Sequence, residues 1–352
     1  MSGRLRVALI AGGRSSEHEI SLASARSVLS ALDPERYDVV SVAIGRDGRW
    51  AIDPESNSGV RPRLAGSDPP VVVPAVTLPV PAEDGTMAVV GGVDVVLPIL
   101  HGPFGEDGTV QGLLELIDVA YVGAGVAASA LAMDKDLFKK VLRDSGIPVA
   151  RHHAIRLGDP VTNPFGYPVF VKPARLGSSV GISKVHDESE LGPAVELARR
   201  HDEKVLVEDF VTGMEVECGL LGNRQPPPIA SLPGRIDTLD HEWYDYSSKY
   251  DEDGMELIVP PELPPETIEL VQQRAVDAFI ASECEGLARV DFFVRDSDGE
   301  VVVNELNTMP GFTATSVYAK LFEASGVSYR ELLDRLIELA LERRERRSSL
   351  QY

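Results

Sequence analysis

The chain begins by alternating strand-like and helix-like segments, and this alternation limits the folds open to it. Residues 6–13 are an apolar, strand-like run, residues 15–33 follow with helical spacing of their apolar positions, and residues 37–44 are a second strand-like run. A strand, a helix and a strand in this order open a doubly wound α/β domain built on a parallel sheet.

Two loops of this first part place polar residues beside glycines. Ser15 and Ser16 are the predicted caps of the first helix, with Glu17 in its first turn. Residues 93–100 form a buried strand that runs directly into the Gly-rich loop 101–108 and another helix. Open α/β sheets bind ligands where a strand ends in such a loop. Neither loop matches G-x-G-x-x-G, so a dinucleotide fingerprint is absent.

The remainder of the chain mixes helices with strands and becomes richer in strands after about residue 215. The polar stretch 236–256 is long for a compact enzyme and predicts a lid, although surface decoration is nearly as typical. The Arg-rich run 343–347 is interpreted as a solvated helix end. Helical patterns cover 128–146, 187–201, 265–282 and 329–347, and strand patterns cover 167–174, 204–211 and 215–222.

Residues 287–312 are predicted to form a β-hairpin, because two runs rich in Val and Phe flank the turn sequence DSDGE. A turn centred on 297–299 places Asp291 opposite Glu305, and Arg289 opposite the asparagine of NELNT. Side chains two positions apart share a face, so all four project from one side of the sheet.

The chemistry of this face suits a metal bound to phosphate. Two carboxylates and the amide of Asn307 are hard oxygen donors of the kind that Mg²⁺ prefers, and Arg289 suits an oxyanion. The hairpin taken alone is, however, more typical of a solvated acidic surface.

Three further segments contain residue types that bind nucleotides. The loop 175–181, RLGSSVG, offers backbone and hydroxyl donors for phosphate oxygens, and Lys172 precedes it. Lys135 lies on a helical pattern, and Glu208 ends a strand where it could accept a hydrogen bond from a purine amino group. Each has an ordinary alternative: a polar hairpin, a solvated lysine, a plain strand end. No Walker loop occurs.

Composition restricts the partners and the compartment. A net charge of −21 makes nucleic acid and anionic membranes unsuitable partners, and no stretch approaches the ~20 apolar residues that span a bilayer. Cys218 and Cys284 are too few for a disulfide framework or a zinc site, and are interpreted as small buried hydrophobes. The apolar run at the N-terminus is too short for a signal peptide, so the protein is predicted to be cytoplasmic.

Taken together and in order, the motifs resemble those of the D-alanine–D-alanine ligases, which belong to the ATP-grasp superfamily. The resemblance extends from about residue 5 to about residue 340, and it rests on GRSSEHEISL, HGPFGEDGT, MDK, KPARLGSSVGISK, VEDFVTGMEVE, YDYSSKY, ARVDFF and NELNTMPGFT. It implies an N-terminal α/β domain that binds the first D-alanine (1–125), a central ATP-grasp domain (126–213), and a C-terminal ATP-grasp domain (214–352) that carries the metal site and the lid 236–256.

The same resemblance implies the nucleotide and metal ligands. Lys135 and Lys172 would bind phosphates, Lys249 would reach them from the lid, and Asp209 stands where some relatives carry lysine. Asp291, Glu305 and Asn307 match residues that bind two Mg²⁺ or Mn²⁺ ions. The implied ATP contacts are Lys135, Lys172, Ser178, Ser179, Gly181, Glu208, Asp209, Phe210, Val211 (through its backbone), Glu215 and Lys249.

Substrate residues are implied as well. Glu17 matches the acid that receives the ammonium group of the first D-alanine, with His101 beside it. Arg289 and the amide of Gly311 match an oxyanion-stabilising pair, and Ser316 matches the hydroxyl that holds the second substrate's carboxylate. Ser178 and Tyr250 match residues that link the phosphate loop, the lid and Glu17.

The implied reaction joins two D-alanines through a D-alanyl phosphate, releases ADP and phosphate, and supplies peptidoglycan precursors for the cell wall and cell shape. A homodimer is the family expectation. One alternative is a ligase that takes D-lactate or D-serine second, although the tyrosines of YDYSSKY disfavour D-lactate. Another is a non-catalytic nucleotide-binding regulator, which is disfavoured because Lys172, Arg289 and the acidic residues are all present.

Overall fold

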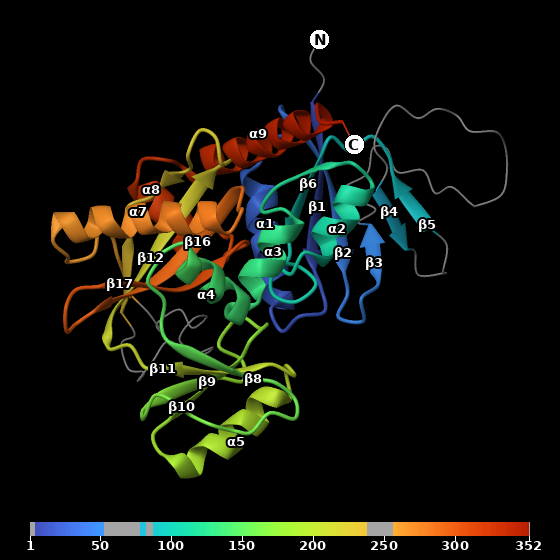
Figure 1. Ribbon diagram of the computed structural model, residues 1–352. Coiled ribbons are helices and arrows are strands. Elements are labelled where there is room, and N and C mark those ends of the chain that lie inside the picture. The colour runs from blue at the N-terminus through green and yellow to red at the C-terminus, as the bar shows by residue number, and fades with distance from the viewer. Residues whose placement is uncertain (1–3, 53–77, 82–86, 238–255, 352) are drawn as a thin grey trace.

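The computed structural model describes residues 4–52, 78–81, 87–237 and 256–351. Its strands form three sheets and one small hairpin, which Figure 1 shows as two α/β layers side by side with a smaller sheet below them. The hairpin pairs β4 (Leu78–Pro81) with β5 (Met87–Val90). Across the described residues, no helix has the length and apolar character needed to cross a membrane.

The N-terminal sheet has the strand order β3-β2-β1-β6-β7, parallel except for β3. Every residue of β6 is buried, as expected for a parallel strand covered on both faces. Because β2 and β6 flank β1, the strand order reverses there, which leaves a ligand crevice at the carboxyl ends. The predicted doubly wound domain is confirmed. Its elements are β1 (Leu5–Gly12), α1 (His18–Ala31), β2 (Tyr37–Ile44), β3 (Trp50–Ile52), β6 (Val95–Ile99), α2 (Thr109–Leu116) and β7 (Ala120–Tyr121).

The predicted caps of α1 are wrong. The helix begins at His18, its N-cap is Glu17, and no side chain caps it. Ser15 instead donates from its hydroxyl to the carbonyl of His101 (2.7 Å) and accepts from the amide of Glu17 (3.3 Å). This serine therefore ties the start of α1 to the loop that follows β6, and it fixes Glu17 beside His101.

The central sheet is antiparallel, has the order β10-β9-β11-β8, and is covered on one face by α5. Its apolar residues form a cluster of their own that includes Val171, Val195 and Val207. The elements are β8 (His152–Ile155), β9 (Val169–Pro173), β10 (Ser183–Val185), α5 (Glu188–Arg199) and β11 (Val205–Asp209).

The C-terminal sheet has the order β15-β14-β12-β16-β17, with β13 pairing to β12, and packs against several helices. Both cysteines are free and buried here, as predicted. The elements are β12 (Gly213–Gly222), β13 (Ile229–Ala230), β14 (Gly234–Asp237), β15 (Glu256–Ile258), α7 (Pro265–Ala281), β16 (Gly286–Arg295), β17 (Val301–Asn307), α8 (Val317–Ala324) and α9 (Tyr329–Ser348).

The hairpin of β16 and β17 has the predicted register at its functional end. Arg289 lies opposite Asn307, and Asp291 lies opposite Glu305. The register shifts by one residue at a bulge after Asp291, so the register predicted nearer the turn is wrong. The turn lies half a residue from the predicted centre, and the bulge compensates for this difference.

The predicted helix over 128–146 is two helices, α3 (Val126–Met133) and α4 (Lys135–Asp144). The break falls at Asp134, whose backbone is extended and whose carboxylate accepts from the amide of Leu137 at 3.1 Å. An aspartate at such a position stabilises a new N-terminus better than a helix interior. Lys135 thus becomes the first residue of α4 and not a mid-helix residue.

One apolar core joins the N-terminal and C-terminal sheets. It includes Val7 and Leu97 from the N-terminal sheet, Leu287 from the C-terminal sheet, and Leu333 and Ile337 from α9. In Figure 1, α9 runs across both layers at the top of the molecule. The Arg-rich end of α9 is predicted to be solvated, and this is wrong for Arg343. Its side chain is buried and donates to the carbonyls of Tyr121 and Gly123.

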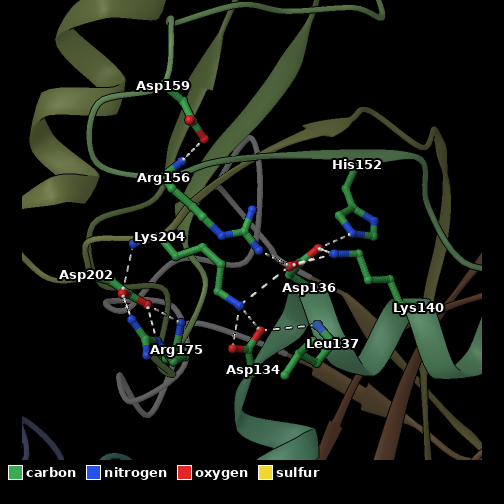
Figure 2. A network of polar contacts seen from close by, with 10 residues as sticks. All are labelled: Asp134, Asp136, Leu137, Lys140, His152, Arg156, Asp159, Arg175, Asp202 and Lys204. Atoms are coloured by element: carbon green, nitrogen blue, oxygen red, sulfur yellow. Dashed lines mark hydrogen bonds and ion pairs between the residues drawn. The ribbon is translucent and has the colours of Figure 1, made fainter.

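A polar network connects α4 with the central sheet (Figure 2). Asp136 is 1% exposed, and its carboxylate contacts Lys140 (2.9 Å), His152 (3.1 Å) and Lys204 (3.5 Å). Burial raises the pKa of Asp136, but hydrogen bonds from Lys140 and His152 outweigh burial, so the pKa lies below its ordinary value. The carboxylate is therefore charged in the folded protein and compensated by its neighbours.

Replacing Asp136 with asparagine should lower the free energy of unfolding by about 2 kcal/mol at pH 7, because a neutral amide oxygen makes weaker contacts to Lys140, His152 and Lys204 than the buried carboxylate does. A carboxyl whose pKa is depressed by folding stabilises above its unfolded pKa, and this stabilisation is lost as the pH falls through the folded pKa. The difference in free energy of unfolding between wild type and variant should therefore be largest at pH 7 and shrink below about pH 4. Urea unfolding at several pH values measures it. Asp144→Asn, at the exposed end of the same helix, is the control; an equal loss there would contradict the prediction.

Candidate functional site

A cavity of about 530 Å³ lies between the central and C-terminal sheets. The rings of Phe170 and Phe210, whose centroids are 5.8 Å apart, line one part of it, and Lys184 lies 4.8 Å from the Phe210 ring. Aromatic and cationic groups of this kind suit a flat base carrying phosphates. Of the predicted nucleotide contacts, the cavity is lined by Lys135, Lys172, Ser178, Ser179, Glu208, Phe210, Val211 and Glu215.

Of the predicted nucleotide contacts that the structure describes, two do not line this cavity. Asp209 accepts hydrogen bonds from the guanidinium of Arg151 at 2.7 and 2.9 Å. Gly181 lies in the phosphate loop with φ +72°, where an added Cβ would approach the ring of His201 to 2.7 Å. Asp209 belongs to an ion pair at the rim, and Gly181 shapes the loop.

The loop between β9 and β10 has an unusual backbone. Ser178 and Ser179 are consecutive non-glycine residues with φ of +53° and +55°. Left-handed residues of this type are uncommon, and such turns direct backbone N–H groups into one concavity that attracts anions. The Ser178 hydroxyl also donates to the carboxylate of Glu17, so the phosphate loop contacts the N-terminal domain.

The two lysines of the cavity are already paired with carboxylates. Lys172 donates to Glu208 at 2.7 Å, and Lys135 lies 3.1 Å from Glu305 while donating to the carbonyl of Leu176 at 2.9 Å. Both ammonium groups are less than one-tenth exposed. A ligand with several negative charges can therefore replace these carboxylates as the partner of the lysines, and the lysines would neutralise part of its charge.

Asp291, Glu305 and Asn307 lie together at the edge of the cavity. The Asn307 side-chain nitrogen donates to Asp291 at 3.0 Å, so the side-chain oxygen is the atom that could bind a metal ion. Among the described residues, no group of three or more His, Cys, Asp or Glu could hold a metal by itself. Two carboxylates plus one amide oxygen nevertheless fit Mg²⁺, which takes few protein ligands and completes its shell with waters and phosphates.

Arg289 connects Asp291 with a further buried carboxylate, that of Glu217. Its guanidinium makes two 2.7 Å hydrogen bonds to Asp291 and lies 2.9 Å from Glu217. Glu217 is 1% exposed and pairs with Asp291 across β12 and β16. The sequence analysis missed Glu217, although the alternation of acids in GMEVE on β12 places it on the same face as Glu215.

A second cavity, of about 550 Å³, adjoins the first. Both are lined by Gly177, Ser178 and Glu305, so a group transferred between two ligands could pass at this point. The predicted substrate residues lie around the second cavity, which is lined by Glu17, His101, Ser178, Arg289, Gly311 and Ser316.

His101 and Ser316 are held by backbone carbonyls. His101 is 3% exposed and donates from Nδ1 to the carbonyl of Met309 at 2.9 Å. Burial lowers its pKa, against the opposing charge of Glu17, so the ring is neutral near pH 7. The Ser316 hydroxyl donates to the carbonyl of Thr313 at 2.7 Å and precedes α8 without capping it.

Glu106, in the loop HGPFGEDG, was not singled out from the sequence. Its carboxylate accepts from the amides of Gly102 (2.7 Å) and Met309 (3.2 Å). Burial, followed by the charge of Glu17, raises its pKa to about 8. It joins the loop after β6 to the segment after β17. An acid inside the Gly-rich loop 101–108 is the signal that could have indicated it.

Part of the predicted site cannot be placed. Lys249 and Tyr250, together with residues 238–255 of the predicted lid, lie outside the described residues.

Two families match the chain by their sequence patterns. Residues 6–124 match the family described as "D-ala D-ala ligase N-terminus", and residues 141–338 match "D-ala D-ala ligase C-terminus". The chain is 46% identical to a D-alanine–D-alanine ligase A of Mesorhizobium japonicum, a match that covers 99% of this chain and 100% of that one.

Solved structures agree with this result. The D-alanine–D-alanine ligase from Coxiella burnetii superimposes with a TM-score of 0.81 at 35% identity, covering 99% of this chain and 97% of its own. The VanG D-Ala:D-Ser ligase from Enterococcus faecalis superimposes with a TM-score of 0.79 at 33% identity, covering 96% and 99%.

Proposed function

Since the chain belongs to the D-alanine–D-alanine ligase family, whose ATP-dependent reaction serves peptidoglycan precursor synthesis, we propose that its two adjoining cavities divide this reaction between them. The cavity between the sheets would bind ATP, and the second cavity would bind two D-alanines. The shared wall at Ser178 and Glu305 is the observation that carries the proposal, because ligands in the two cavities would meet there, a terminal phosphate next to a substrate carboxylate.

In the first step, a carboxylate oxygen of one D-alanine attacks the γ-phosphorus of ATP, and the bond to the β-phosphate oxygen breaks. Glu17 would hold the ammonium of this D-alanine, with neutral His101 beside it. Lys135, Lys172 and the amides around Ser178 and Ser179 would compensate the phosphate charge. The products are ADP and a D-alanyl phosphate.

In the second step, the amine of the other D-alanine attacks the acyl carbon, and phosphate leaves with the bonding electron pair. Arg289 and the amide of Gly311 would stabilise the negative charge on the acyl oxygen, a contact worth about 3 kcal/mol. Ser316 would hold the carboxylate of the attacking D-alanine. The amine loses a proton, and the product is D-alanyl-D-alanine.

Asp291, Glu305 and Asn307 would hold two Mg²⁺ or Mn²⁺ ions. When bound, such ions neutralise developing charge on the transferred phosphoryl group. Arg289 holds the Asp291 carboxylate in a fixed orientation through two hydrogen bonds.

The larger organisation is part of the same proposal. We propose the domains 1–125, 126–213 and 214–352, which is supported by the three sheets falling into these segments to within one residue. Residues 236–256, with Lys249 and Tyr250, would form the lid. A homodimer in the cytoplasm is the expected state of the enzyme.

Incubation of the protein with ATP, Mg²⁺ and a mixture of D-alanine, D-serine and D-lactate, with products identified by mass, tests the proposal. D-alanyl-D-alanine should be the main product. The likeness to a D-Ala:D-Ser ligase makes D-serine the informative competitor. If D-alanyl-D-serine were the main product, the second substrate would be D-serine. ATP binding without any product would favour the non-catalytic alternative.

A further inference from the structure

Lys139 is a second lysine on α4, one turn after Lys135, and its side chain is completely buried. Its ammonium lies 3.0 Å from one carboxylate oxygen of Glu208, Oε2, and donates to the carbonyl of Asn304 at 3.0 Å. Glu208 belongs to β11 and Asn304 to β17, strands of the two sheets that enclose the nucleotide cavity. A buried ammonium is costly unless it is paired, so these contacts need an explanation.

Glu208 is shared by two lysines with different access to the cavity. Lys172 contacts its Oε1 atom and lines the cavity, whereas Lys139 contacts Oε2 and does not line it. Anionic phosphates can therefore attract Lys172 away from Glu208. Lys139 cannot follow, because it is 0% exposed and held by a backbone carbonyl as well.

Glu208 gains capacity to accept a hydrogen bond when Lys172 moves. Its Oε2 atom is buried against the Lys139 ammonium, whereas its Oε1 atom accepts from Lys172 and would be released if Lys172 turned to the phosphates. Burial raises the pKa of Glu208, but the charges of Lys139 and Lys172 outweigh burial and hold the pKa near 2. The carboxylate is thus ionised and can only accept.

We propose that Lys139 is a positioning residue for the nucleotide base: it holds the Glu208 carboxylate ionised and in place to accept from the 6-amino group of a purine when Lys172 turns to the phosphates. The inference rests on the role proposed above for Glu208. It adds that the preference for a 6-amino over a 6-oxo purine depends on a residue that never touches the nucleotide.

The test compares ATP with ITP, which carries a 6-oxo group, in wild type and in Lys139→Met. Without the buried cation, Glu208 can take up a proton and donate to a 6-oxo group. We expect the ratio of kcat/KM for ATP to that for ITP to fall about tenfold, and KM for D-alanine to stay within about twofold. A purely structural role would weaken both nucleotides equally. Lys139→Arg should restore part of the ratio.

Lys140→Met is the matched control, because it removes the neighbouring lysine of the same helix, which is 48% exposed and contacts Asp136 instead. The double variant Glu208→Gln with Lys139→Met removes both charges of the pair. If Lys139 acts through Glu208, the two changes should not be additive, and the double variant should fold even where Lys139→Met does not.

The outcomes separate the two proposals. An unchanged ATP to ITP ratio in Lys139→Met, a double variant that also fails to fold, or an equal effect of Lys140→Met overturns the role of Lys139. An unchanged ratio in Glu208→Gln overturns the assignment of Glu208 and the role of Lys139 with it. Binding of ATP and ITP by calorimetry gives the same ratio without D-alanine, so it holds whether or not the ligase reaction is observed.

Discussion

Asp291→Asn should reduce D-alanine-dependent ADP release by about 10³-fold or more, because loss of this charge removes several kcal/mol of stabilisation from phosphoryl transfer. Asp291 is 4% exposed and accepts from both Arg289 and Asn307. Asparagine keeps the size of the side chain but offers one neutral oxygen in place of a charged pair. Initial rates at increasing Mg²⁺ measure the effect, and excess Mg²⁺ should not restore the rate.

The control for this variant is Asp298→Asn, at the exposed turn of the same hairpin. It makes the same chemical change in the turn of this hairpin, and Asp298 lines neither cavity. Its turnover should equal that of wild type. Wild-type turnover in Asp291→Asn itself would rule out the assignment of Asp291 as a metal ligand.

Arg289→Lys should lower kcat by about 10²-fold, because a lysine cannot replace a guanidinium that binds two carboxylates and an oxyanion in fixed directions. Arg289 is proposed to act mainly in the second step. We therefore expect more ADP released per dipeptide formed, since D-alanyl phosphate that is not captured by the amine is lost to water. ADP and dipeptide measured in the same reaction give this ratio.

Arg295→Lys is the matched control for this second variant. Arg295 lies on the same strand, and two nitrogens of its guanidinium donate to the carboxylate of Asp298. Unlike Arg289, it is partly exposed and lies at the turn. Its kcat and its ADP to dipeptide ratio should not change. An unchanged kcat in Arg289→Lys would exclude Arg289 from the oxyanion role.

The face of the hairpin could be predicted from the sequence because strand periodicity is local. Alternation in RVD and NELN determines which side chains share a face, and the turn residues determine the pairing to within one position. The bulge after Asp291 could not be predicted, because strand periodicity does not show where one strand carries an extra residue. Its effect is confined to the residues nearer the turn.

Buried ionic partners could not be predicted, because their burial is a property of the tertiary structure. The approach of β11 and β17 places Glu208 and a backbone carbonyl beside Lys139. The pairing of β12 with β16 places Arg289 beside Glu217. The break at Asp134 belongs to the same class, since aspartate is compatible with either a cap or an exposed helix position.

The apolar core that joins the N-terminal and C-terminal sheets makes these two layers a single rigid body, while the central sheet keeps its own core. Ion pairs such as those of Asp136 and Lys204 make the connection between the two bodies. Contacts of this kind re-form at slightly different angles more easily than interlocked apolar side chains do. The arrangement is therefore that of a clamp, in which the central sheet can tilt against the two sheets that share the apolar core.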